Sequence, residues 1–126
     1  MRKILLFLLL ITTLYSSELK FHDYDDALAI SEKNGKVVMV MLSREGCPAC
    51  EYMEDVVFKD KNVIKVLNRD FLAVHIDIYK GFVPDDMPHF GTPTFYFVDK
   101  NEKKLETFVG GKHAKNFIKI LEAVKP

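Results

Sequence analysis

The stretch that decides the fold of this chain is Arg44-Glu45-Gly46-Cys47-Pro48-Ala49-Cys50-Glu51. It contains the only two cysteines of the protein, and one residue, Ser43, separates it from the apolar run Val37–Leu42. An amphipathic segment comes immediately after it. A strand that leads into a helix places the first cysteine at the helix N-terminus, which favours its thiolate, and the second cysteine one turn further on. The stretch therefore predicts a site for thiol–disulfide exchange.

Length and composition restrict the possible classes of protein. The chain has 126 residues, enough for one domain, and 48% of them are hydrophobic, which can support a compact core. Its 18 basic and 18 acidic residues give a formal net charge of zero. This balance gives no indication of a nucleic-acid partner. We see no internal repeat and no low-complexity tract, so we expect a single globular domain.

The first 16 residues have the pattern of a signal peptide. Basic residues at Met1-Arg2-Lys3 precede an apolar run at 4–14, and Ser16-Ser17 supplies small residues for cleavage. The apolar run is shorter than the roughly 20 residues of a transmembrane helix. We expect cleavage after Ser16, a domain at 17–126, and a periplasmic or otherwise exported protein. An uncleaved membrane anchor is the alternative.

The cysteine pair could also be a structural disulfide or part of a zinc site. A Cys-X-X-Cys disulfide closes a very small loop and restrains the unfolded chain little, so it is a weak structural crosslink. Zinc needs further ligands, but there is no second cysteine pair, and the 4 histidines lie far apart in the sequence. We therefore expect no metal and no cofactor.

Hydrophobic spacing and turn residues predict alternating helices and strands. A strand, a helix and a second strand in this order indicate a right-handed parallel crossover, with the cysteines at the carboxyl end of the first strand. The two later strands are expected to form a hairpin. The predicted helices cover 23–34, 48–58, a short segment from Asp60 or Asn62, and 113–124, and the predicted strands cover 36–42, 71–77, 94–98 and 105–109.

This order of elements, with Gly91-Thr92-Pro93-Thr94 just before the hairpin, resembles the thioredoxin fold. The run from Cys47 through Glu54 and Phe58 to Val63 is similar to exported thioredoxin-like proteins. These include the C-terminal thioredoxin domain of the reductant conductor DsbD and its small stand-alone relatives. The resemblance covers essentially the whole mature chain. It implies an α/β fold with a four-stranded mixed sheet, βαβ then ββα, flanked by helices and preceded by an N-terminal helix.

The resemblance also implies roles for residues of the site. The Thr92–Pro93 peptide bond would be cis and lie beside the first cysteine, where the backbone before the proline pairs with an extended substrate segment. Cys47, nearest the helix N-terminus, would be the nucleophile, and Cys50 would resolve the mixed disulfide. Glu54 would tune the acidity of the thiols or relay protons. The alternative for Glu54 is a solvated surface carboxylate.

Two positions depart from the family pattern. Many thioredoxins carry a buried aspartate six residues before the first cysteine, where this chain has Met41. Any base for Cys50 must then be Glu54, another group or water. The tryptophan that usually precedes the first cysteine is replaced by Gly46, and the chain contains no tryptophan.

The direction of electron flow has only weak signals in the sequence. Pro48-Ala49 places no histidine between the cysteines, which argues against a very strong oxidant. We expect a monomeric reductase or exchange protein that acts on thiols and disulfides of exported proteins, with electrons from a membrane thiol conductor. The alternatives are a disulfide oxidase or isomerase, and a non-enzymatic module that holds peptides at the Thr-Pro edge.

Overall fold

The structure, a computed structural model, describes residues 18–126. The predicted signal peptide and its cleavage site lie outside the described residues. Within residues 18–126, no helix is both long enough and apolar enough to cross a membrane.

A four-stranded mixed sheet forms the centre of the molecule, with the strand order β2-β1-β3-β4. β1 (Val37–Ser43) runs parallel to β2 (Phe71–Asp77) and antiparallel to β3 (Thr94–Val98), which pairs in a hairpin with β4 (Lys104–Val109). The expected parallel crossover and hairpin are both confirmed.

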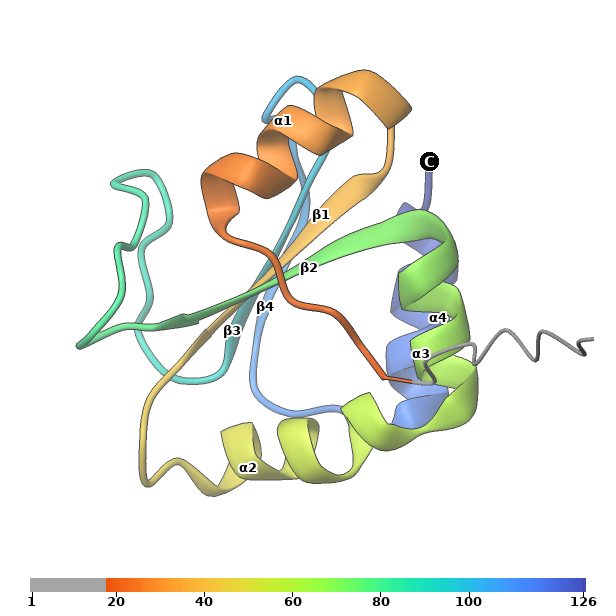
Figure 1. Cartoon of the computed structure of the whole chain (residues 1–126). Helices are drawn as coiled ribbons and strands as arrows, with labels where there is room; N and C mark the ends of the chain where they lie inside the picture. The colour runs from red at the N-terminus through yellow and green to blue at the C-terminus, as the bar shows by residue number, and fades with distance from the viewer. Residues whose placement is uncertain (1–17) are drawn as a thin grey trace, which may run out of the picture.

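Helices cover both faces of this sheet (Figure 1). α1 lies on one face, whereas α3 and α4 lie on the other, and α2 follows the carboxyl end of β1. This arrangement confirms the α/β architecture expected from the sequence, including the N-terminal helix. The bounds of the helices are Tyr24–Asn34 for α1, Pro48–Asp55 for α2, Lys61–Asp70 for α3 and Ala114–Val124 for α4.

The helix after the cysteines is shorter than predicted. α2 ends at Asp55, the backbone leaves helical geometry at Val56 (φ −117°, ψ −62°), and the short 3₁₀ helix η1 follows at Val57–Lys59. This break lets two consecutive side chains, Val57 (0% exposed) and Phe58 (4%), both enter the core. In a continuous α-helix, consecutive side chains point to different faces.

β1 is buried at every position, as expected for a strand covered on both faces. Its side chains alternate between two apolar clusters. Val38, Val40 and Leu42 face the cluster that contains Ala27 of α1. Val37, Met39 and Met41 face the cluster that contains both cysteines. The cysteines therefore belong to the core beneath α2, α3 and α4.

The N-cap residues of α1 and α3 differ in their contacts. Asp60, the N-cap of α3, accepts hydrogen bonds from the backbone N–H groups of Asn62 (2.9 Å) and Val63 (3.1 Å). Asp23 occupies the N-cap position of α1, but its side chain makes no capping hydrogen bond. At the other end of α1, Gly35 has φ of 75°, the left-handed conformation that glycine adopts without strain.

Candidate active site at the Cys47–Cys50 disulfide

The two cysteines form a disulfide at the start of α2. Cys47 is the N-cap of the helix, with extended backbone (φ −100°, ψ 106°), and Pro48 opens the first turn. Proline suits this position because its missing N–H would have no helical partner. Cys47 and Cys50 are 2% and 1% exposed. The sulfurs thus lie at the edge of the core.

Hydrogen bonds distinguish the two sulfur atoms. Cys47 Sγ accepts the backbone N–H of Cys50 at 3.2 Å and the hydroxyl of Thr92 at 3.3 Å. No hydrogen bond within residues 18–126 reaches the Cys50 sulfur. Donors aimed at a sulfur stabilise its anionic form. The surroundings therefore favour negative charge at the first cysteine.

The loop before β3 lies directly against Cys47. The Thr92–Pro93 peptide bond is cis, and the carbonyl oxygen of Thr92 lies 3.5 Å from Cys47 Sγ. The loop is held on both sides, because Gly110 donates its N–H to the Pro93 carbonyl at 2.8 Å and the Thr94 hydroxyl donates to Gly91 at 2.6 Å. The structure thus brings together four of the five residues predicted for the site.

The fifth predicted residue, Glu54, has a different partner. Its carboxylate lies 2.9 Å from Nε2 of His75 on β2. Among the described residues, no hydrogen bond joins it to either cysteine. Met41 is fully buried in the same apolar cluster as Cys50, so the position where many thioredoxins carry an acid is part of the core.

Sequence reasoning considered the four histidines as metal ligands, rejected that role, and missed the pairing of His75 with Glu54. The available signal was its position in the predicted strand 71–77. His75 is exposed between the buried residues Val74 and Ile76, so it stands out in an otherwise apolar strand. Within residues 18–126, no group of three or more His, Cys, Asp or Glu side chains is arranged to hold a metal ion.

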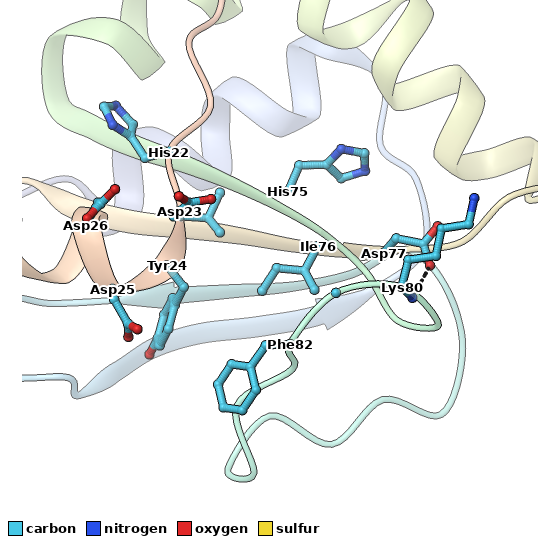
Figure 2. A pocket seen from close by; sticks show the side chains of 12 residues that line it. His22, Asp23, Tyr24, Asp25, Asp26, His75, Ile76, Asp77, Lys80 and Phe82 are labelled. Carbon is cyan, nitrogen blue, oxygen red and sulfur yellow. Dashed lines mark hydrogen bonds between the residues drawn. The ribbon is translucent and has the colours of Figure 1, made fainter.

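Small pockets adjoin the cysteine pair on two sides. One, with a volume of about 330 Å³, includes Thr92, Arg44 and the exposed rings of Tyr79 and Phe90. The other, about 360 Å³, includes Ala49 from between the cysteines. A larger cavity, about 580 Å³, lies along β2 beside α1, and no cysteine lines it (Figure 2). The small pockets, unlike the larger cavity, are lined by residues that contact or adjoin the two cysteines.

Charges near the pair are mixed in sign. Glu45 forms an exposed ion pair with Lys80, and its hydrogen bond raises the pKa of Lys80. Arg44 donates to the backbone carbonyl of Glu45 at 3.2 Å. The surface around the disulfide therefore has no strong charge of either sign.

A buried Cys-X-X-Cys disulfide at the start of a helix, with a Thr-Pro loop against its first sulfur, supports a thiol oxidoreductase in general. The family model described as a thioredoxin-like domain matches residues 24–125. The chain therefore belongs to this thioredoxin-like family.

Solved structures have the same fold. A thioredoxin from Thermus thermophilus is 29% identical, with a TM-score of 0.70 over 85% of this chain and 87% of that chain. The C-terminal domain of DsbD from Neisseria meningitidis is 19% identical, with a TM-score of 0.61 over 82% of this chain and 98% of that domain. The oxidoreductase DsbH is 18% identical, with a TM-score of 0.66 over 86% and 87%. A search of curated proteins found no match.

Proposed function

We propose that the protein is an exported thiol–disulfide oxidoreductase that exchanges disulfides with partner proteins, with Cys47 as nucleophile and Cys50 as resolving cysteine. The observation that carries this assignment is the asymmetry of hydrogen bonds. The Cys50 N–H and the Thr92 hydroxyl both point at Cys47 Sγ. In the reduced protein, the same donors would stabilise a Cys47 thiolate.

In the reducing direction, the Cys47 thiolate attacks one sulfur of a partner disulfide. A bond forms between Cys47 and that sulfur, and the other partner sulfur leaves as a thiolate. Cys50 then attacks Cys47 Sγ, which forms the Cys47–Cys50 disulfide and releases the second partner thiolate. Two electrons pass from the cysteine pair to the partner. The backbone at Thr92, before cis Pro93, would hold the partner segment by strand addition.

Export and the direction of exchange belong to the same proposal. The basic and apolar pattern of residues 1–16 supports export. Pro48-Ala49 between the cysteines supports a reductase, because neither side chain stabilises a thiolate strongly. A membrane thiol conductor would then supply the electrons, and disulfides of other exported proteins would be the substrates.

The reduction potential of the Cys47–Cys50 pair tests the direction. We expect a value close to that of thioredoxin, about −270 mV, and far below that of the strong oxidant DsbA, about −120 mV. The measurement is equilibration of the protein in glutathione or dithiothreitol buffers, with the thiol state read by alkylation and mass. A potential near that of DsbA would contradict a reductase and support the oxidase alternative.

The hydroxyl of Thr92 has a separable contribution. At a pH below the titration midpoint of Cys47, we expect Thr92→Val to reduce the fraction of Cys47 present as thiolate by roughly tenfold. A hydrogen bond to a charged group contributes about 1.5–3 kcal/mol. The measurement is the pH dependence of Cys47 alkylation in the reduced protein. Thr107→Val, on exposed β4, is the matched control. An unchanged midpoint in Thr92→Val would show that the hydroxyl does not stabilise the thiolate.

A further inference from the structure

β1 contributes no acidic side chain to the core beside the cysteines. A titratable side chain nevertheless lies next to Met41, the position where many thioredoxins carry an acid. Met41 is 0% exposed and packs in the same cluster as Cys50. The parallel register of β1 and β2 pairs Met41 with His75. Paired residues of neighbouring strands project to the same face of a sheet. The first titratable group beside Met41 is therefore on the adjacent strand.

His75 connects β2 to both α2 and β1. Its Nε2 atom lies 2.9 Å from Glu54 Oε1 and 3.0 Å from Ser43 Oγ. The ring also packs against Phe21, with ring centroids 5.6 Å apart. In Figure 2, the His75 side chain leaves β2 on the opposite side from Tyr24. Contacts from α2, from β1 and from the segment before α1 thus hold the imidazole on the face of the sheet that α2 covers.

The His75–Glu54 pair lies between the buried cysteines and solvent. Glu54 follows Cys50 by one helical turn, so the two side chains share a side of α2. A pocket of about 350 Å³ is lined by Ser43, Glu54 and His75 together with Gly46, the neighbour of Cys47. The side chains of His75 and Glu54 are 32% and 35% exposed. Protons can therefore pass between the pair and bulk water through this pocket.

We propose that His75 is a positioning residue that orients Glu54 and sets its charge, so that the His75–Glu54 pair accepts the proton of Cys50 in place of an acid at Met41. This inference rests on the proposed exchange function. Ser43 Oγ holds the imidazole at Nε2, the atom that contacts the carboxylate.

The Cys50 thiol gives its proton, through water, to the His75–Glu54 pair while its sulfur attacks Cys47 Sγ. The bond between Cys47 and the partner sulfur breaks, the Cys47–Cys50 bond forms, and the partner leaves as a thiolate that takes a proton from solvent. The pair then returns its proton to water through the pocket.

Other charged groups line the surrounding pockets, but among the described residues His75 is the one that contacts the Glu54 carboxylate. Beyond Glu54, a second pocket brings Glu18, Asp55 and Lys59 close to its side chain. The groups around the shared pocket are Arg44, Glu45, Glu51 and Asp77. The groups that line the cavity on the other side of His75 are His22, Asp23, Asp25, Asp26 and Lys80 (Figure 2).

Protonation of His75 changes the charge beside the thiols. When the imidazole is charged, it cancels the negative charge of Glu54. When the imidazole is neutral, the carboxylate is ready to accept a proton. The pH profile of the Cys50 step should therefore depend on the imidazole, and a variant without it should have a flatter profile.

A stopped-flow reaction of the reduced protein with one equivalent of Ellman's reagent separates the two steps. The first aryl thiolate reports attack by Cys47, and the second reports attack by Cys50. We expect His75→Gln and Glu54→Gln to slow the second phase by about tenfold or more and to flatten its pH profile. The first phase should change by less than about twofold. The double variant should be no slower than the slower single variant, since the two groups act as one unit.

The control is His22→Gln, a histidine beside β2 whose side chain forms no hydrogen bond with Glu54 or with either cysteine among the described residues, and it should keep both phases and the wild-type pH profile. Thermal unfolding of each variant shows that it is folded at the assay temperature. A His75→Gln variant with the wild-type second phase and pH profile would overturn the inference. An equal slowing of the second phase in His22→Gln would also overturn the inference. If the wild-type protein released no second thiolate, the proposed exchange function itself would fail.

Discussion

Cys47→Ser is expected to abolish disulfide exchange, with a loss of rate on the order of 10³-fold or more, as for removal of a catalytic nucleophile. The serine hydroxyl stays protonated and cannot replace a thiolate in attack on a disulfide. The assay is reduction of a disulfide-bonded protein such as insulin, with dithiothreitol as electron source. A Cys47→Ser protein that kept its activity would contradict the assignment of the nucleophile.

Cys50→Ser is the matched control, because it removes the neighbouring sulfur with the same chemical change. This variant should still attack partner disulfides through Cys47, but it should stop at the mixed disulfide and accumulate as a covalent adduct. Mass spectrometry of the adduct identifies the attached partner. Adducts formed by Cys47→Ser and absent from Cys50→Ser would reverse the two roles. Partner binding unaffected by either variant would favour the peptide-binding module.

Phe117→Ala is expected to lower the free energy of unfolding by about 3–5 kcal/mol, as for other large-to-small changes in cores. Phe117 is 0% exposed and lies on α4. Its ring centroid is 5.5 Å from that of Phe95 and 6.0 Å from that of Phe58. Truncation would leave a cavity between α4, the sheet and η1. Urea unfolding followed by circular dichroism measures the loss.

Phe90→Ala removes the same atoms from the surface and is the control for this experiment. Phe90 is 97% exposed, so the change should alter the free energy of unfolding by no more than about 0.5 kcal/mol. Equal losses in the two variants would mean that Phe117 does not support the core as its burial indicates.

Most strand positions could be predicted from the sequence, because β1, β2 and β3 are mainly apolar runs that end in charged or turn residues. β2 and β3 occupy the predicted residues 71–77 and 94–98. The end of α2 could not be predicted, because an amphipathic pattern continues through Val57 and Phe58. Only the packing of both side chains into the core forces the break after Asp55.

The sequence by itself determined the cysteine pair and its place at a helix start, since these depend on spacing within one turn. It also suggested Thr92 and Pro93, but only through a family resemblance. The tertiary structure decided which groups touch them. Thr92 reaches Cys47 across 45 residues of sequence, and His75 on β2 meets Glu54 on α2. Such contacts arise when distant segments pack together, so no local pattern of residues specifies them.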